Sequence, residues 1–364
     1  MRTIRLENVS KSLGGELILD DVSLAIPTGQ FFAILGPSGC GKTTILRLLA
    51  GLEAVDSGKI YIGSEDVTNV PVFDRRVNTV FQNYALFPHL SVFENVAYSL
   101  RLKDFEEDDV VDKVSSFLKM IGLLGHENKL PATLSGGQKQ RVALARALVG
   151  EPEVILFDES LSALDPKLKE RMLIDLMELQ YKLKTTFVYV THDQTEALTV
   201  ADNMAIMNLD GSIAQIGAPK EVYEFPVSRF VADFVGNTNL FEGVLHKGDD
   251  GLFFLEVERL GNIKVAVSEQ MNWMIPGGKA HASVRPEKIE IRKERLSGFS
   301  NCLKGVVWST SYSGRSTQYQ IMLDNGQKSI AFERNVEHIS HEKIVDDDVV
   351  YVHFKEENVV LLEN

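Results

Sequence analysis

Up to about residue 235, short apolar runs alternate with segments whose apolar residues recur at helical spacing. Three runs are almost continuously apolar: Phe31 to Leu35, Val154 to Asp158 and Thr186 to Val190. Runs of this kind are typical of parallel strands in a sheet that is covered on both faces. The pattern therefore predicts an α/β domain over residues 1–235.

A helix is predicted between the second and third of these strands. Asp165 is a favourable N-cap residue, and Pro166 suits the first helical position. The apolar residues that follow share one helical face: Leu168, Met172, Leu176, Leu179 and Leu183. A strand, a helix and a strand in this order predict a parallel crossover unit.

Beyond residue 235 the pattern changes to short alternating runs separated by turn signals. Paired strands are predicted in four segments, residues 252–267, 279–291, 316–332 and 349–362. Asp324 to Gly326 predicts a hairpin turn within the third segment. We therefore expect residues 236–364 to form an all-β domain, either one small barrel or a pair of barrels.

Composition limits the classes of protein that fit this pattern. The chain has 364 residues, enough for two or three ordinary domains, and 44% of them are hydrophobic. No apolar run approaches the roughly 20 residues of a membrane-spanning helix, and the N-terminal segment lacks the features of a signal peptide. We therefore expect a cytoplasmic chain. Its net charge of -13 argues against broad charge-driven binding to nucleic acid or anionic lipid. Cys40 and Cys302 lack the spacing of a disulfide framework or a zinc site.

The strongest chemical signal follows the first predicted strand. GPSGCGKT, residues 36–43, fits the phosphate-binding pattern GxxxxGK followed by Ser or Thr, and it precedes the helical run ILRLLAGL. Its glycines let backbone N–H groups surround a phosphate, and the helix N-terminus and Lys42 add positive charge. Thr43 is the expected hydroxyl ligand of Mg²⁺. The residues predicted to bind the nucleotide are Gly36, Pro37, Ser38, Gly39, Cys40, Gly41, Lys42, Thr43 and Thr44.

Polar side chains stand at the ends of two further predicted strands. Asp158 and Glu159 follow the run VILF, where α/β sheets present their ligand sites. We expect Asp158 to serve Mg²⁺ and its water, and Glu159 to be the general base for the water that attacks the γ-phosphate. His192 follows the run TFVYVT and is expected to contact the γ-phosphate and hold the water. Gln82 is expected to sense Mg²⁺ and the attacking water.

A second glycine pair precedes another helical run. In LSGGQ, residues 134–138, the segment Ser135, Gly136, Gly137 and Gln138 places a hydroxyl group and backbone N–H groups at a helix N-terminus, which is an anion site. The phosphate loop covers one side of the nucleotide and leaves the other side of its γ-phosphate open. A two-fold dimer fills that side with the second copy's Ser135 loop, so that two chains complete two sites.

These motifs together resemble the ATPase subunit of ATP-binding-cassette (ABC) transporters. The phosphate loop, Gln82, LSGGQ, the strand VILFDE, the segment 162–165 and His192 occur in that order, and the resemblance covers about residues 2–234. It implies a P-loop NTPase fold with a mixed sheet, a helical subdomain at about residues 84–150, and ATP and Mg²⁺ as ligands. It also implies a head-to-tail homodimer in which Asp165 reaches across the interface. Residues 236–364 resemble the regulatory domain of such importers, which is built on OB-like folds of the TOBE type, and residues 283–291 are similar to its recurring strand-turn-strand segment.

The same resemblance implies partners for the chain. Two integral membrane permease subunits are expected to dock on residues 84–95, and an extracytoplasmic substrate-binding protein is expected to deliver the solute. The chain is then peripheral, at the cytoplasmic face of the cell (inner) membrane. Residues 77–100 and 158–165 are most similar to the importers of the polyamines spermidine and putrescine, with import of ferric iron, a sugar or sulfate as the alternative.

One position departs from the family pattern. An aromatic residue usually stacks on adenine near residues 12–14, where this chain has Leu13. A leucine still packs on the ring but lacks the aromatic gain of about 0.5–1.5 kcal/mol. Selectivity for ATP over GTP is therefore left open by the sequence.

Two other classes of protein remain as alternatives. A soluble ABC ATPase of DNA repair or translation usually has long coiled-coil insertions or two cassettes, and this sequence has neither. A module that binds single-stranded nucleic acid on its C-terminal barrels would need basic grooves with stacked aromatic residues. Acidic residues outnumber basic ones beyond residue 235, so nucleic acid is not the expected partner.

Overall fold

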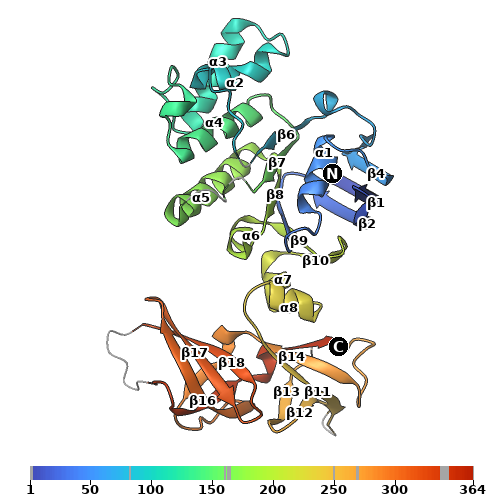
Figure 1. Ribbon diagram of the computed structural model, residues 1–364, viewed down its shortest axis with the longest axis vertical. Coiled ribbons are helices and arrows are strands. Elements are labelled where there is room, and N and C mark those ends of the chain that lie inside the picture. Colours follow the sequence, from blue (N-terminus) through green and yellow to red (C-terminus); the bar gives the residue numbers. More distant parts are fainter. Residues whose placement is uncertain are drawn as a thin grey trace. The chain divides into compact units, whose positions relative to one another are not determined.

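A computed structural model describes residues 3–81, 83–159, 161, 165–248, 251–267, 270–336 and 344–363. The chain divides into two compact units, Met1–Lys220 and Glu221–Asn364. The first unit is coloured blue to yellow-green in Figure 1, and the second is coloured yellow to red. Each unit has its own apolar core.

A six-stranded, mostly parallel sheet forms the centre of the first unit. Its strand order is β10-β9-β3-β8-β7-β6, in which β10 is an antiparallel edge strand. The strands are β3 (Phe31–Leu35), β6 (Val77–Val80), β7 (Val154–Asp158), β8 (Thr186–Thr191), β9 (Asn203–Met207) and β10 (Ile213–Gly217). Strands β3, β7 and β8 are almost entirely buried, so the prediction from their continuous apolar runs is confirmed.

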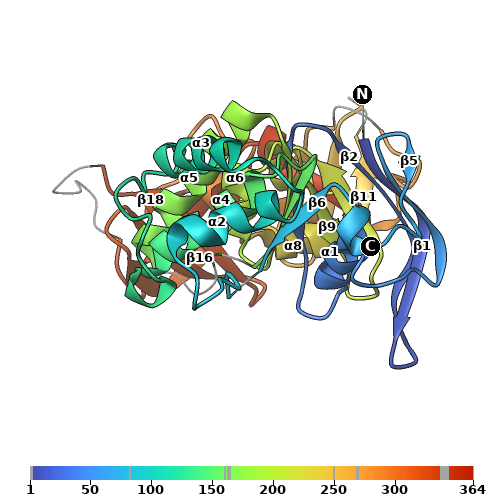
Figure 2. The same ribbon diagram turned by 90° about the horizontal axis from the view of Figure 1, so that it is seen from above.

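A four-stranded antiparallel sheet, in the order β2-β1-β4-β5, lies in the same unit. Its strands are β1 (Thr3–Leu13), β2 (Glu16–Pro27), β4 (Ser57–Ile62) and β5 (Glu65–Asp66). This sheet, helix α1 (Lys42–Ala50) and one face of the six-stranded sheet share an apolar core. The turn between β1 and β2 projects from the rest of the unit, as Figure 2 shows.

Helices share a second core with the opposite face of the six-stranded sheet. They are α2 (Val92–Arg101), α3 (Glu107–Met120), α4 (Gly136–Leu148) and α5 (Pro166–Leu183), and the shorter α6 (Gln194–Val200) follows β8. The predicted crossover is confirmed, since β7 and β8 are parallel neighbours joined through α5. Asp165 is the N-cap of α5, and Met172, Leu176 and Leu179 are buried along its predicted face.

The second unit is built mainly of strands, as its alternating pattern predicts. Two antiparallel five-stranded sheets, β13-β12-β11-β14-β20 and β15-β19-β16-β17-β18, share one core. Their strands are β11 (Asn239–Lys247), β12 (Phe253–Val257), β13 (Gly261–Val265), β14 (Lys279–Val284), β15 (Glu290–Arg292), β16 (Asn301–Tyr312), β17 (Ser316–Leu323), β18 (Lys328–Arg334), β19 (Val349–Phe354) and β20 (Val359–Glu363). The hairpin predicted at Asp324 to Gly326 joins β17 to β18, and Gly326 takes the positive φ of 83° that this turn requires.

The division between the units lies within α7 (Pro219–Glu224), earlier than the boundary expected after residue 235. Buried Arg285 accounts for this division. Its guanidinium group donates hydrogen bonds to the carbonyl oxygen of Tyr223, in α7, and to that of Ala232, in α8 (Arg229–Phe234). It also binds the carbonyl oxygens of Gly236 and Asn237. The segment that precedes β11 therefore packs with the β-rich unit.

Candidate nucleotide-binding site

The predicted phosphate loop joins β3 to the N-terminus of α1. Gly41 is the N-cap of α1 with a φ of 95°, and no side chain caps the helix. The first backbone N–H groups of the helix are therefore free to donate hydrogen bonds to a ligand at the loop, and a phosphate group is a suitable acceptor. Lys42 is buried, and its Nζ donates to the carbonyl oxygens of Gly36 at 2.9 Å and Pro37 at 2.7 Å. The ammonium group thus lies within the loop.

Two glycines of this loop have no room for a side chain. A Cβ at Gly41 would lie 2.6 Å from Leu19 Cδ2, and the positive φ already disfavours other residues. A Cβ at Gly36 would lie 2.6 Å from Cys40 Sγ and 3.0 Å from the carbonyl oxygen of Met207. The spacing of glycines in the motif therefore reflects packing of the loop against β2 and β9.

Thr43 and Asp158, the two residues expected to serve Mg²⁺, lie in contact. The Thr43 hydroxyl donates a hydrogen bond of 3.1 Å to Asp158 Oδ1. Burial raises the pKa of Asp158, the Thr43 hydrogen bond opposes this rise, and the negative charge of Glu159 adds to it. Two hard oxygen ligands, one on a carboxylate whose charge is disfavoured by burial, are a suitable donor set for Mg²⁺.

Glu159 and His192 also lie together, although they are far apart in the sequence. Glu159 Oε1 is 3.2 Å from His192 Nδ1, and the Glu159 backbone N–H donates to the Val190 carbonyl oxygen. Glu159 has a φ of 45°, a conformation that non-glycine residues rarely adopt and that recurs at functional sites. Gln82, the third predicted catalytic residue, lies outside the described residues.

The second glycine motif opens α4. Ser135 is its N-cap and forms a capping box with Gln138, in which each side chain accepts a hydrogen bond from the other residue's backbone N–H. Ser135 and Gly136 are exposed, whereas Gly137 is buried. A Cβ atom added at Gly137 would lie 3.1 Å from the Leu168 side chain in α5. Both views place α4 in a different part of the unit from α1 (Figures 1 and 2). Within one chain, the helix of the phosphate loop and the helix of the second motif are thus separate.

The remaining predicted residues lie at exposed positions. Asp165 is exposed and accepts a hydrogen bond from the Leu168 backbone N–H, and the segment 162–164 before it lies outside the described residues. Leu13 ends β1 beside the projecting turn and is 39% exposed. An exposed apolar side chain at the tip of a hairpin is a suitable surface for a planar base.

A tryptophan at position 13 is expected to strengthen nucleotide binding. Aromatic stacking adds about 0.5–1.5 kcal/mol, so Leu13→Trp should lower the Kd for ATP by a factor of about 2–10. Titration calorimetry with ATP and with GTP measures this effect, and Leu124→Trp, at an exposed position of the helical part, is the control. An unchanged Kd would show that the base does not contact position 13.

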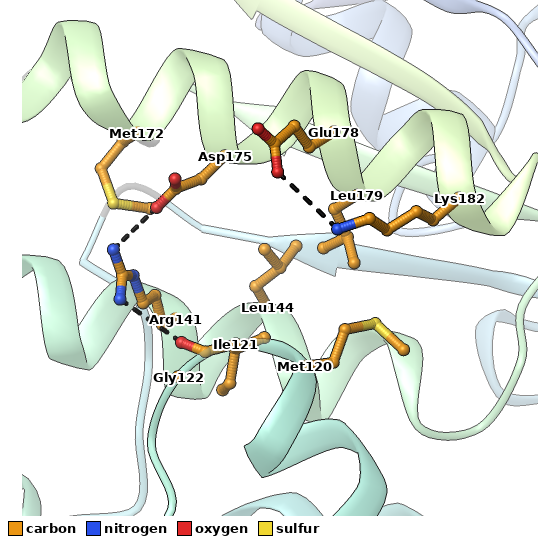
Figure 3. Close-up of a pocket in the computed structure, with 10 residues that line it drawn as sticks. All are labelled: Met120, Ile121, Gly122, Arg141, Leu144, Met172, Asp175, Glu178, Leu179 and Lys182. Atoms are coloured by element: carbon orange, nitrogen blue, oxygen red, sulfur yellow. Dashed lines mark hydrogen bonds and ion pairs between the residues drawn. The ribbon is translucent and has the colours of Figure 1, made fainter.

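A pocket of about 220 Å³ lies elsewhere, between the helical part and α5. Figure 3 shows Arg141 of α4 directed at Asp175 of α5, with Leu144 and Leu179 between the helices. The Arg141 guanidinium donates to Asp175 Oδ2 at 2.7 Å and also reaches the carbonyl oxygen of Ile121. The predicted nucleotide-binding residues do not line this pocket, so the ion pair ties α4 to α5 rather than forming part of the phosphate site.

The sequence did not point to two residues that border the site. Lys169 of α5 and Glu196 of α6 form an ion pair, and Glu196 is only 3% exposed. A signal was present, because an aspartate followed three residues later by a glutamate marks the start of a helix directly after His192. Acidic residues in a first helical turn are so common that this signal is weak.

These features together define a nucleotide-hydrolysing protein of the ABC class: the mostly parallel sheet, the phosphate loop, the acidic end of β7 and the helix N-terminus at Ser135. The pattern of the ABC transporter family matches residues 19–162, and that of the TOBE domain matches residues 282–362. The protein cbiO1 from Clostridium perfringens, part of the ABC transporter complex cbiONQ, has a similar solved structure. The match has a TM-score of 0.57 at 30% identity and covers 60% of this chain and 89% of that one.

Full-length relatives identify the family more narrowly. The spermidine/putrescine import ATP-binding protein PotA of Thermotoga maritima is 42% identical over 99% of this chain and 98% of its own length. The proteins of the same name from Fusobacterium nucleatum and Escherichia coli K12 are 45% and 44% identical over 90% and 91% of this chain, and over 87% and 86% of their own lengths. The chain belongs to this family of ABC transporter ATP-binding proteins, so it is an ATPase and its nucleotide is ATP. Among the described residues, no helix is long and apolar enough to cross a membrane.

Proposed function

We propose that this chain is the ATP-hydrolysing subunit of an importer for the polyamines spermidine and putrescine. One observation carries the proposal. Relatives named for this import match 99% of the chain, so the likeness includes the C-terminal unit as well as the cassette. A likeness confined to the ATP-binding motifs would fit transporters of many solutes, because those motifs serve the nucleotide alone.

The working form is a homodimer with two composite sites. The phosphate loop and the Ser135 motif open different helices, which lie apart in one chain. A head-to-tail pair brings the Ser135 to Gly137 segment of one copy to the nucleotide held by the other. Exposed Asp165 is then in a position to reach across the same interface.

Thr43 and Asp158 are the residues that hold Mg²⁺ in this proposal, and Gln82 is the third. The close approach of the Thr43 hydroxyl to Asp158 supports the assignment. A Mg²⁺ ion held by these residues would supply positive charge that neutralises the phosphate oxygens.

Hydrolysis follows from the placement of the chain's own side chains. Lys42 and the N–H groups at the start of α1 bind the phosphate oxygens, and Glu159 accepts the proton of the attacking water as general base. His192, 3.2 Å from Glu159, orients that carboxylate and contacts the γ-phosphate. When the γ-phosphate leaves, the contact that it makes with both copies is lost and the dimer opens.

This opening and closing is passed to the proposed partners. Two integral membrane permease subunits dock on residues 84–95, where Tyr84 and Ala85 have positive φ values of 62° and 44°. Arg146, near the end of α4, holds this segment by donating hydrogen bonds to the carbonyl oxygens of Tyr84 and Ala85. Movement of α4 is therefore transmitted to the docking segment. A substrate-binding protein on the far side of the membrane delivers the polyamine, the chain lies at the cytoplasmic face, and the TOBE-containing unit regulates the cycle.

The ATPase rate of the complete complex tests this function. The chain, its two permease subunits and the substrate-binding protein are reconstituted in vesicles, and hydrolysis is measured with the binding protein loaded with spermidine, putrescine, ferric iron, maltose or sulfate. Stimulation by the two polyamines alone is expected. Stimulation by another of these solutes would replace the proposed substrate and leave the cassette mechanism in place.

A further inference from the structure

A cluster of charged side chains joins the start of α5, which Asp165 caps, to the start of α6, which follows His192. Lys169, near the start of α5, places its ammonium group 2.8 Å from Asp193 Oδ2 and also pairs with the Glu196 carboxylate. Asp193 is the N-cap of α6 and directly follows His192. One ammonium group therefore joins the start of α5 to the start of α6.

The carboxylate of Glu196 is fully engaged in this cluster. The Tyr189 hydroxyl donates a hydrogen bond of 2.6 Å to Glu196 Oε2, the Thr191 hydroxyl donates to the same oxygen, and Lys169 contacts Oε1. Burial, reinforced by the negative charge of Glu196, raises the pKa of Tyr189, so this hydroxyl remains a donor. Glu196 is buried, whereas Lys169 and Asp193 are partly exposed. A partly buried ionic network is rigid when every member has a partner, and breaking it at its buried member is costly.

Asp193 fixes the turn in which His192 lies. Its carboxylate accepts hydrogen bonds from the backbone N–H groups of Thr195 and Glu196, and its own N–H donates to the Thr191 hydroxyl. Burial opposes the charge of Asp193, but the Lys169 ammonium group and the backbone N–H groups of Glu196 and Thr195 together hold the pKa of Asp193 below its usual value. His192 is thus flanked by two residues, Thr191 and Asp193, that the cluster holds in place.

We propose that Lys169 and Glu196 are positioning residues for ATP hydrolysis, which hold His192 against Glu159 and couple that pair to the start of α5, which Asp165 caps. This inference rests on the catalytic roles proposed above for Glu159 and His192. The cluster lies on β8, α5 and α6, whereas the phosphate loop opens α1. Loss of the cluster therefore displaces the catalytic pair without removing a group that binds the phosphates.

Kinetics of Lys169 variants test the assignment. Lys169→Met removes the ammonium group and keeps much of the side-chain volume. Because a displacement of about 1 Å costs about 100-fold in rate, kcat should fall by about 10- to 100-fold. The Kd for ATP should stay within about twofold. Lys169→Arg should retain most of the activity because it keeps the charge, and Lys167→Met, at an exposed position of the same helix, should behave as wild type.

A second variant guards against simple unfolding. Glu196→Gln keeps one acceptor oxygen for the Tyr189 and Thr191 hydroxyl groups but places an NH2 group, which cannot accept a hydrogen bond, against the Lys169 ammonium group. It should therefore lower kcat in the same way. Parallel losses of kcat, ATP affinity and thermal stability in both variants would overturn the inference, since they indicate a structural role alone.

The His192→Ala background separates this inference from the proposed function. If Lys169 acts through His192, then Lys169→Met combined with His192→Ala should be no slower than the slower of the single variants. Normal hydrolysis by Lys169→Met, with slow hydrolysis by His192→Ala, would overturn the positioning role and leave the catalytic role of His192 intact. Normal hydrolysis by His192→Ala would overturn both.

Discussion

Glu159→Gln is expected to lower the rate of ATP hydrolysis by about 10²- to 10⁴-fold while ATP still binds, because general-base catalysis contributes a factor of this size. The glutamine has nearly the shape of the glutamate but cannot take the proton of the attacking water. Glu159 directly follows the β7 strand, and its backbone N–H donates a hydrogen bond to the Val190 carbonyl oxygen. The substitution should therefore leave the backbone of the site unchanged, and ATP that is not hydrolysed should keep the two copies closed.

A single-turnover measurement with labelled ATP checks this expectation. Unhydrolysed ATP should remain bound to the Glu159→Gln protein and should co-elute with a dimer on gel filtration. Glu170→Gln, at an exposed position of α5, is the matched control and should hydrolyse ATP normally. Normal hydrolysis by Glu159→Gln would remove Glu159 from the role of base.

Ser135→Arg should abolish turnover and leave ATP binding by the isolated chain largely intact. Ser135 is the exposed N-cap of α4, and the phosphate loop opens the separate helix α1. A long cationic side chain at position 135 blocks the approach of α4 to the nucleotide of the second copy. Loss of the N-cap hydrogen bond costs only about 1 kcal/mol, so the fold should persist.

Steady-state hydrolysis and equilibrium ATP binding are the two measurements needed for Ser135→Arg. Thr133→Arg places the same charge at an exposed position two residues earlier and should retain activity. If Ser135→Arg instead loses ATP binding in the monomer, Ser135 contacts the nucleotide of its own chain, and the composite site is wrong.

The sequence predicted those parts of the fold whose conformation is determined by residues close together in the chain. Continuous apolar runs gave the buried strands β3, β7 and β8, and Asp165 followed by Pro166 gave the start of α5. The motifs pointed to Thr43 and Asp158 as residues that serve Mg²⁺, and in the structure these two side chains lie in contact. In each case neighbouring residues determine the conformation, or a strand end determines the location.

The rest depends on contacts between distant residues. The β1–β4 pairing joins segments separated by the whole phosphate loop, and no local period specifies it. Lys169 and Glu196 are residue types that usually lie on the exposed face of a helix, and only the packing of α5 on α6 brings them together and buries Glu196. Arg285 likewise binds α7 and α8 across a long stretch of sequence, which moves the division between the units into α7.

Uptake of labelled spermidine tests the central claim most directly. Cells that lack their own polyamine importer receive the permease and substrate-binding subunits together with either this chain or its Glu159→Gln variant. Uptake with the wild-type chain and none with the variant is the expected result, and it would establish substrate, direction and ATP dependence together. Absence of uptake with both, while the purified chain hydrolyses ATP normally, would contradict polyamine import.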